Sequence, residues 1–599
     1  MARRAIGTEI SATALQMGVI AATPRPAAGA EGEAGSRDAL AKLNEAVSEL
    51  RTLALQPILQ RALSALNAGD HRTGETWALK ALEQDERSGL GWYILAFARE
   101  KAGDFVSSIK CYESALSLMP DHAEVANDLG RLAYRMGMIE QAEKLFRHFL
   151  ARYPDHIEGA NNLASALREL GRGDEAMEIL RAAILAHPEA SMLWNALGAV
   201  MSERGDFDNA QIFFLETLRL DPGFAKARYN LGNSRLSLGD PEGALADCDA
   251  ALKLPVGEDE RQMMRLARST TLIALGRIGE GWEEYEARLH PQFAGVTHFQ
   301  IERPQWKPDD SLEGRAFLVI GEQGLGDEVL FANLMEDVRR DLGPDGRLLI
   351  AVEPRLVDLF QRTFPDAVVG AHATYNVGGR TARFMPFIED HESIDLWSPM
   401  GSLLRAYRTE VPAFPDRPRY MTPDPERVDH WRSVLAQAPA GPKIGLLWKS
   451  AVTANARRRF FSPFEGWTPV LNVPGVSFVN LQYGDCAAEI EAARRVLGVE
   501  IWNPPGIDLK QDLDDVAALC CAMDLVIGFS NATLNLGAAC GAPTWLISVP
   551  GAWPRLGCED RYPWYPQARV YAPQVLGAWD PMMAQIAADL TALTGGAEQ

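Results

Sequence analysis

Two groups of basic residues stand out in the second half of this 599-residue chain, where lysine is scarce. Lys449 directly follows an apolar run at 444–448, and the triplet Arg457-Arg458-Arg459 comes soon after. A lysine ammonium at the end of a strand suits a phosphate, and the arginine fork matches a phosphate or a carboxylate. Exposed, solvated cations are the alternative for both groups. Because the whole chain has a net charge of −21, we interpret this local cluster as an anion-binding site.

Polar residues follow two other strand-like apolar runs. Ser530, Asn531 and Thr533 lie between such a run and a helical stretch, where their side chains and the N–H groups of the helix start form a natural anion site. N-capping by Ser530 or Asn531 is the alternative, and both interpretations predict the same local geometry. Gln482 and Tyr483 end another run, where they can form the wall of a site for a nucleotide base.

A glycine-rich loop, 321–327, joins a strand-like run to a helical one. It matches neither a dinucleotide-binding nor a P-loop pattern. Gly324 and Gly326 permit close approach of a ligand. Asp327 stands at the helix entrance, where it can act as a general base that takes a proton from an acceptor hydroxyl. A capping role is the alternative, and the two roles are compatible only if one carboxylate oxygen stays available.

Strand-like and helix-like segments alternate through the second half of the chain and must position these residues. One series falls within 291–420 and begins after an irregular, proline-bearing connection at 290–310, and the other falls within 421–599. This alternation predicts two doubly wound, Rossmann-like α/β domains. Two such domains facing each other form the GT-B architecture, with ligands at the carboxyl ends of the strands. We expect the last helical run, 580–593, to reach back to the first domain.

The first half of the chain repeats itself every 34 residues. The recurring positions include Pro120, Pro154, Pro188 and Pro222, and six glycines from Gly69 to Gly239. Glycine permits a tight turn, and proline stops a helix. The period resembles that of the tetratricopeptide repeat (TPR), in which each unit is a pair of antiparallel helices. We expect an α superhelix over 46–290, with a concave groove that binds an acceptor protein.

Asparagine and tyrosine side chains recur at two adjacent registers on the first helix of these units. They are Tyr93, Asn127, Asn161, Asn162, Asn195, Tyr229 and Asn230. A column of amides can pair with the backbone of an extended peptide, and tyrosines can anchor it. The column resembles the asparagine ladder of repeat-fused protein glycosyltransferases. Surface amides without a ligand are the alternative.

The segment from 525 to 547 and the loop ending in Gly324-Leu325-Gly326-Asp327-Glu328 resemble the donor-site segment and the acceptor-side loop of family 9 heptosyltransferases. The resemblance implies that Asp327 is the catalytic base, and it matches Lys449 to the donor-phosphate lysine only loosely. The family's aspartate, threonine and histidine are replaced by Ser530, Asn531 and Asn535. These replacements point away from the usual sugar-diphosphate donor.

The combination of repeats and GT-B half resembles the bacterial flagellin glycosyltransferases of the FlmG type. That resemblance implies transfer of a nonulosonic acid, pseudaminic or legionaminic acid, from a CMP-sugar to Ser or Thr of flagellin during flagellum assembly. The TPR domain would dock flagellin, and the reaction would need no metal or other cofactor. The alternatives are a non-catalytic binding scaffold and a transferase that acts on another protein or an envelope glycan.

The composition of the chain restricts its partners and its cellular location. Its acidic balance argues against a nucleic-acid partner, which needs a basic face. No stretch approaches the roughly 18 uncharged apolar residues of a membrane-spanning helix. Seven scattered cysteines without a CxxC pattern predict reduced thiols and a cytoplasmic location. Residues 1–45, rich in Ala, Gly and Pro, predict a disordered tail.

Overall fold

The structure, a computed structural model, describes residues 42, 53–377, 380–450 and 459–595. The chain divides into two compact units, residues 1–187 and 188–599. The expected tail over 1–45 lies outside the described residues, apart from residue 42.

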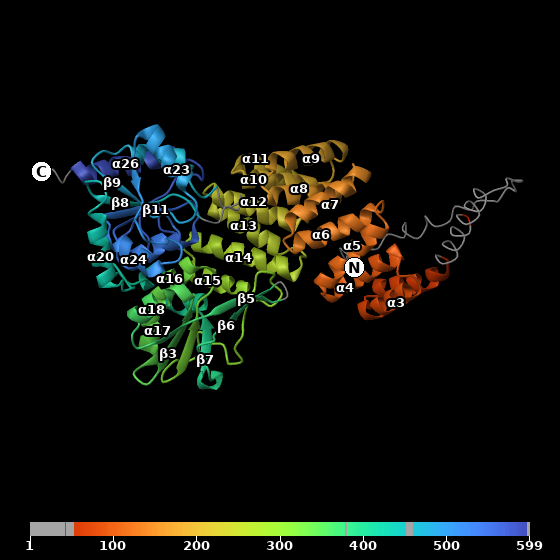
Figure 1. Ribbon diagram of the computed structural model, residues 1–599, viewed down its shortest axis with the longest axis horizontal. Helices are drawn as coiled ribbons and strands as arrows, with labels where there is room; N and C mark the ends of the chain where they lie inside the picture. The colour runs from red at the N-terminus through yellow and green to blue at the C-terminus, as the bar shows by residue number, and fades with distance from the viewer. Residues whose placement is uncertain (1–41, 43–52, 378–379, 451–458, 596–599) are drawn as a thin grey trace, which may run out of the picture. The chain divides into compact units, whose positions relative to one another are not determined.

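The first unit is entirely helical in its described part. Residues 53–67 form a helix, and the helices that follow are α3 His71–Gln84, α4 Gly89–Ala102, α5 Phe105–Leu118, α6 Ala123–Arg135, α7 Ile139–Arg152, α8 Ile157–Glu169 and α9 Gly173–Ala186. The second unit opens with α10 Ser191–Glu203, α11 Phe207–Leu220, α12 Ala225–Ser237, α13 Pro241–Leu252, α14 Glu258–Ala274 and α15 Ile278–Tyr285. Figure 1 shows the helices as successive antiparallel pairs, as the period predicts.

The 34-residue period has a direct structural cause. The six recurring glycines, from Gly69 to Gly239, have φ between 75° and 87°, the left-handed conformation that lets the chain turn between the two helices of a pair. The small residues of the period, such as Ala142 and Ala176, are fully buried where the helices meet. An aspartate caps several second helices; Asp104, for example, accepts a hydrogen bond from the Ser107 N–H at 3.1 Å.

The first α/β domain is built on a four-stranded parallel sheet in the order β4-β3-β2-β7. Its strands are β2 Ala316–Ile320, β3 Arg347–Val352, β4 Val368–Ala371 and β7 Leu396–Pro399, and its helices are α16 Leu325–Phe331, α17 Met335–Leu342, α18 Val357–Thr363 and α19 Leu404–Tyr407. The strand β2 is buried at every position, as expected for a sheet covered on both faces.

The second α/β domain has a six-stranded, fully parallel sheet in the order β10-β9-β8-β11-β12-β13. Its strands are β8 Lys443–Leu447, β9 Ser477–Asn480, β10 Ile501–Trp502, β11 Leu525–Phe529, β12 Thr544–Ile547 and β13 Arg569–Tyr571. Its helices are α20 Pro425–Leu435, α22 Thr468–Leu471, α23 Ala487–Ala492, α24 Leu513–Ala522, α25 Ala532–Ala539 and α26 Trp579–Gly595. In chain order this is strand order 3-2-1-4-5-6, that of a doubly wound Rossmann domain.

Short helical turns complete the second unit. They are η1 Glu286–Leu289, η2 Ala332–Leu334, η3 Pro354–Leu356, η4 His391–Ser393, η5 Met400–Leu403, η6 Val411–Ala413, η7 Phe464–Trp467, the π-helical η8 Ala493–Leu497 and η9 Trp553–Arg555. The predicted fold class, a TPR superhelix followed by α/β domains, is confirmed.

Two local expectations were wrong. The segment 290–310 is not only a connection, because β1 Thr297–Phe299 pairs with β6 Arg380–Phe384, which pairs in turn with β5 Ala373–Val377 in a separate three-stranded sheet. Helix α26 does not join the core of the first α/β domain. Its apolar residues, Met583 among them, pack in the core of the second sheet instead.

Candidate functional site

Each parallel sheet has one place where the strand order reverses, and the residues predicted to do chemistry lie beside it. In the second domain the reversal falls between β8 and β11, so Lys449 and Ser530 follow the two central strands. In the first domain it falls between β2 and β7, and the loop 321–327 follows β2. Crevices at these positions are where doubly wound proteins bind ligands.

The start of α25 carries the predicted donor-side residues. Asn531 is the N-cap, because its Oδ1 accepts a hydrogen bond from the Leu534 N–H at 3.0 Å. Ser530 is exposed, whereas Thr533 and Asn535 are buried. The Nδ2 of Asn531 and the Oδ1 of Asn535 are buried polar atoms without a hydrogen-bond partner among the described residues. Such atoms are rare in folded proteins and are commonly satisfied by a ligand or water.

The loop 321–327, which is the predicted acceptor-side loop, places Asp327 in the first turn of α16. Gly324, and not Asp327, is the N-cap of this helix. Asp327 reaches back, and its Oδ2 accepts a hydrogen bond from the Gly324 N–H at 3.2 Å. The carboxylate therefore stabilises the helix start through Oδ2. The preceding residue, Gln323, has a φ of 60°, a strained value for a residue with a side chain.

A buried ion pair, which the sequence did not suggest, holds the beginning of this loop. Glu322 and Arg288 are 2% and 3% exposed and form two hydrogen bonds, at 2.6 and 2.9 Å. Glu322 also accepts a hydrogen bond from the Gly401 N–H at 2.7 Å, which joins the loops after β2 and β7. The two charges lie 34 residues apart in the sequence and share no motif.

A second buried cluster holds the end of the loop. Glu328 accepts a hydrogen bond from the Glu353 N–H at 2.8 Å and contacts His372 Nε2 at 3.0 Å. Arg383, on β6, donates to the Gly321 carbonyl and lies 3.6 Å from Glu328. Burial lowers the pKa of Arg383, and Glu328 partly offsets that effect. These contacts fix the backbone on both sides of Asp327.

A hydrogen bond joins the start of α25 to the loop 321–327. Asn535 Nδ2 donates a hydrogen bond to the Gly326 carbonyl at 3.3 Å. A Cβ at Gly326 would lie 3.2 Å from Asn535 Nδ2 and 3.5 Å from Ala532 Cα, so a side chain here would require the Asn535 amide to shift by a few tenths of an ångström. The structure thus brings together Asp327, Gly326, Asn531 and Asn535, which the sequence placed in two separate motifs.

Tyr562 is a further member of this site that sequence reasoning missed. Its side chain is 1% exposed, and burial raises the pKa of the phenol. The negative charge of Asp327 adds to this rise, and the hydroxyl is a buried polar atom without a hydrogen-bond partner among the described residues. The only sequence signal was an aromatic run that includes Tyr562, Trp564 and Tyr565.

Lys449 and Gln482 have intramolecular partners. The Lys449 ammonium forms an ion pair with Glu489 and donates to the Asp485 carbonyl at 2.6 Å. Gln482 is 1% exposed, and its Oε1 accepts hydrogen bonds from the N–H groups of Trp448 and Lys449 at 3.1 and 2.9 Å. Gln482 thus ties the end of β9 to the end of β8.

Tyr483 follows Gln482 and is half-buried. Its carbonyl accepts a hydrogen bond from Gln482 Nε2 at 2.9 Å. The contact belongs to the Tyr483 backbone, so it gives no information about a base-binding role for the ring.

Arg459 contacts a repeat helix instead of the strand ends. Its Nη1 donates to the Ser202 carbonyl of α10 at 2.7 Å, and its guanidinium lies over the Phe207 and Phe460 rings. Arg457 and Arg458 lie outside the described residues.

The predicted amide column contains two hydrogen-bonded pairs. Asn162 Nδ2 donates to Asn127 Oδ1 at 3.4 Å within the first unit, and Asn230 Nδ2 donates to Asn195 Oδ1 at 3.0 Å within the second. Each pair spans 35 residues, so the one-position offset seen in the sequence is what allows neighbouring amides to meet. Asn161 lies beside Asn162 and is half-buried.

The two tyrosines of this register are largely enclosed. Tyr93 is 4% exposed and donates to Asp128 Oδ2 at 2.6 Å. Tyr229 packs against a core that includes Ala225 and Met264. Burial raises the pKa of both phenols.

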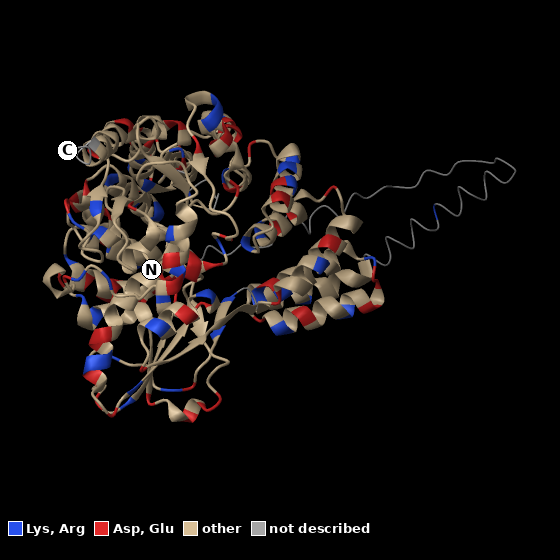
Figure 2. Cartoon of the chain, turned by 60° about the vertical axis from the view of Figure 1, so that its left-hand side comes forward, with Lys and Arg blue, Asp and Glu red and all other residues tan. Residues whose placement is uncertain are grey.

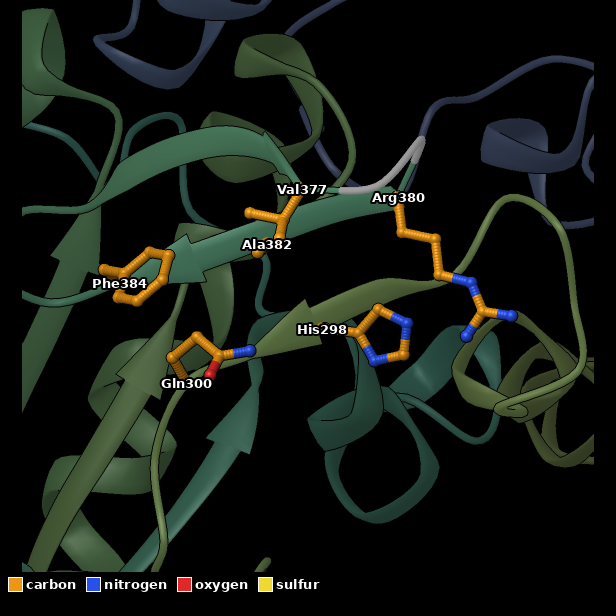
Figure 3. A pocket seen from close by; sticks show the side chains of 6 residues that line it. All are labelled: His298, Gln300, Val377, Arg380, Ala382 and Phe384. Carbon is orange, nitrogen blue, oxygen red and sulfur yellow. The ribbon is translucent and has the colours of Figure 1, made fainter. Parts of the chain in front are cut away.

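A separate pocket of about 180 Å³ lies on the three-stranded sheet (Figure 3). It is lined by His298, Gln300, Val377, Arg380, Ala382 and Phe384. The register puts His298 opposite Ala382 and Arg380 opposite Val377, so these residues share one face of the sheet. Arg383 alternates with them along β6 and therefore points to the opposite face, toward the acceptor-side loop.

Charge on the repeat helices is mixed. Figure 2 shows acidic and basic residues interspersed along them, and many form ion pairs, such as Arg147 with Glu143 and Glu175. In the described part of the chain, no helix has the length and apolarity needed to cross a bilayer. Within the same residues, no group of three or more His, Cys, Asp or Glu side chains is placed to hold a metal ion.

Comparison with known proteins agrees with these features. Tetratricopeptide repeat models match residues 90–155, 127–191, 163–223 and 202–257. Among solved structures, the TPR protein YrrB is 22% identical, with a TM-score of 0.25, over 29% of this chain and 91% of that one. The type IV pilus biogenesis factor PilW is 20% identical, with a TM-score of 0.30, over 33% of this chain and 91% of that one.

The fold and the matches to the repeat models define a TPR protein with a C-terminal α/β region. Protein FlbA of Caulobacter vibrioides is 50% identical over 585 residues, which is 97% of this chain and 98% of FlbA. The chain therefore belongs to the FlbA family.

Proposed function

We propose that this protein is a metal-independent protein O-glycosyltransferase. In this proposal it transfers a nonulosonic acid, pseudaminic or legionaminic acid, from a CMP-sugar to Ser or Thr of flagellin in the cytoplasm. The observation that carries the proposal is the contact between Asn535 and the Gly326 carbonyl. It brings the helix start after β11 against the loop that carries Asp327, so a donor and an acceptor hydroxyl can occupy adjoining places.

The proposed reaction needs one proton acceptor and one anion site. Asp327 takes the proton of the acceptor hydroxyl as the hydroxyl oxygen forms a bond to the anomeric carbon of the sugar. The bond from that carbon to the phosphate oxygen breaks, and CMP leaves with the electron pair. Backbone N–H groups at the start of α25 stabilise the negative charge on the phosphate, aided by the helix dipole.

The TPR helices have the role of capturing the acceptor. The amide pairs Asn127–Asn162 and Asn195–Asn230 leave further donors and acceptors for the backbone of an extended peptide. Linking capture to catalysis raises the local concentration of the acceptor, so a weak peptide site is sufficient. Flagellin as that acceptor is supported by the resemblance to flagellin glycosyltransferases alone.

The catalytic part is tested with Asp327→Asn in the full-length protein. The variant keeps an oxygen that can accept the Gly324 hydrogen bond, so folding is retained while the proton acceptor is lost. Mass spectrometry of flagellin incubated with CMP-pseudaminic or CMP-legionaminic acid should show modification by the wild type and not by D327N. The matched control is D309N, at an exposed loop position of the same domain. Near wild-type transfer by D327N would refute the base assignment.

The capture part is tested with Asn127→Ala combined with Asn162→Ala. Loss of two amides that each contribute about 0.5–1.5 kcal/mol weakens flagellin binding by about 5- to 160-fold in a pull-down titration. The control is Gln141→Ala, which removes an exposed amide from the second helix of a repeat. Equal flagellin affinity in the double variant and the control would exclude the amide column as the binding surface.

A second candidate function is a binding scaffold with an inactive α/β region. The observation that favours it is the ion pair of Lys449 with Glu489, which engages the predicted phosphate-binding ammonium. Calorimetry with CMP and UDP separates the two candidates, because a scaffold of this kind would bind neither nucleotide.

A further inference from the structure

The pocket on the three-stranded sheet exists because small and large side chains alternate along β6. On one face of the sheet, Ala382 lies between Arg380 and Phe384 on its own strand and directly opposite His298 on β1. The larger side chains therefore stand around a floor made by a methyl group, which leaves the cavity of about 180 Å³ (Figure 3). Pockets for drug-sized ligands have about 300–1,000 Å³, so this one has room for a single protein side chain.

One end of this pocket presents hydrogen-bond donors that lack acceptors. Figure 3 shows His298 and Arg380 together at that end, with Phe384 at the other. The Nε2 of His298 is buried and has no hydrogen-bond partner among the described residues. Arg380 is exposed and, unlike Arg383, forms no ion pair in the part of the chain that the structure describes. A guanidinium beside an imidazole nitrogen is a suitable binding place for a carboxylate.

Apolar and aromatic side chains continue the same face beyond the pocket. Tyr375 and Val377 on β5 are 59% and 58% exposed. Tyr375 lies opposite Ala382 in the register and packs edge-on against Phe384, with 5.7 Å between the ring centroids. Single exposed apolar residues are ordinary, whereas contiguous ones rimmed by polar groups mark interaction surfaces. The face therefore fits a protein segment that carries apolar side chains next to an acidic one.

The opposite face of the same sheet holds the acceptor-side loop. Arg383, which follows Ala382 on β6, donates to the Gly321 carbonyl and lies 3.6 Å from Glu328. A protein segment bound at the pocket is thus separated from this loop by the thickness of one sheet, and β6 belongs to both sites. This continuity favours the acceptor protein as the occupant, and the small volume disfavours a nucleotide.

We propose that this face is a docking surface for the acceptor protein. An Asp or Glu side chain of the acceptor enters the pocket, and its carboxylate binds Arg380 and His298, while neighbouring apolar side chains pack on Tyr375 and Val377. The inference rests on the proposed function and adds a second acceptor contact to the amide column of the repeats. A contact beside the acceptor-side loop raises the local concentration of the acceptor hydroxyl there.

Binding titrations of the full-length protein with flagellin test this proposal. Arg380→Gln should weaken binding by about 5- to 20-fold, between the effects of losing an exposed ion pair and a buried charged hydrogen bond. Arg380→Glu should weaken it further, because like charges repel. Ala382→Leu, which fills the pocket and keeps the charge, should cost at least about fivefold by excluding the carboxylate. The matched control is Arg315→Gln, at an exposed arginine of the same domain, which should bind like the wild type.

The outcomes separate this inference from the proposed function. Weaker flagellin binding by both R380E and A382L, with R315Q unchanged, supports the docking surface. Affinity within about twofold of the wild type in either variant overturns it and leaves the proposed function standing, because charge and pocket then do not act together. Thermal melts check folding, and if A382L is unfolded, R380Q and R380E decide. If the wild type neither binds nor modifies flagellin, the proposed function fails, and the inference fails with it.

Discussion

Replacement of Glu322 by methionine is the most direct test of how the acceptor-side loop is held. The Glu322→Met variant removes the bidentate carboxylate of the buried Arg288 guanidinium, which keeps only Glu286, at 2.7 Å, as a carboxylate partner, and it removes the acceptor for the Gly401 N–H. Breaking a buried ion pair by removing one partner typically costs about 3–5 kcal/mol.

The expected effect on melting follows from the size of the unit that contains the pair. At about 2.1 cal/mol/K per residue, unfolding of a unit spanning 188–599 carries an entropy of about 0.9 kcal/mol/K. A loss of about 3–5 kcal/mol therefore lowers the Tm of this unit by about 3–6 °C. Removing both charges, in the double variant R288M/E322M, should recover most of that loss, because the buried guanidinium is gone and Glu286 keeps its ion pair with Arg405 at 3.3 Å.

Differential scanning calorimetry of the full chain measures these shifts. The control is Glu280→Met, which breaks an exposed ion pair with Arg277 and should leave the Tm within about 1 °C of the wild type. The reasoning is refuted if E322M melts like the control, or if the double variant is no more stable than E322M. Either result would mean that the two charges are not coupled in the folded chain.

Further predictions concern the repeat helices and the contact between the two loops. Asp104→Ala should lower the free energy of unfolding of the first unit by about 1 kcal/mol in urea titrations, because it removes the cap of α5. The capping hydrogen bonds hold the pKa of Asp104 below its usual value of 3.8. The ionised cap therefore stabilises the first unit fully above pH 3.8, and this stabilisation is lost as the pH falls through the lowered pKa. The stability of D104A should depend less on pH in this acidic range. Helix α7 has no side-chain cap, and its N-cap position, at the same register as Asp104, is Met138. Met138→Asp should raise the free energy of unfolding of the first unit by up to about 1 kcal/mol. A variant no more stable than the wild type would contradict the capping argument. Gly326→Val should reduce kcat/KM for the proposed transfer at least about tenfold while the Tm changes little, because the valine side chain pushes Asn535 away from the loop. Unchanged kinetics would show that the contact between Gly326 and Asn535 is not needed for the reaction.

The sequence predicted the repeat half in detail because its signals are local. A glycine every 34 residues marks each left-handed turn, and an alanine such as Ala142 marks each close helix contact. Alternating segments likewise predicted two parallel sheets. Strand β1 was missed because it has three residues and is stabilised by pairing with β6, more than 80 residues later.

The candidate site was predicted only in outline, because its contacts are long-range. Motifs drew attention to Asp327 and the start of α25, but nothing local indicates that Asn535 bonds to a carbonyl 209 residues away. The partner of Lys449 is Glu489, 40 residues later, and that of Arg459 is Ser202, 257 residues earlier. Residue type and strand position therefore predicted that both cations bind a ligand at a cleft. In the folded chain, Lys449 instead pairs with a carboxylate, and Arg459 donates a hydrogen bond to a backbone carbonyl.

The packing of α14 and α15 decides where this protein can be cut for engineering. Trp282 of α15 is 1% exposed, donates to the Arg408 carbonyl at 2.8 Å, and shares one hydrophobic core with Phe317 of the first sheet and Leu447 of the second. A transplant that exchanges repeats up to residue 290 would remove a tryptophan from the centre of that core. A chimera joined near residues 187 and 188 would instead exchange the repeats of the first unit while keeping this core whole.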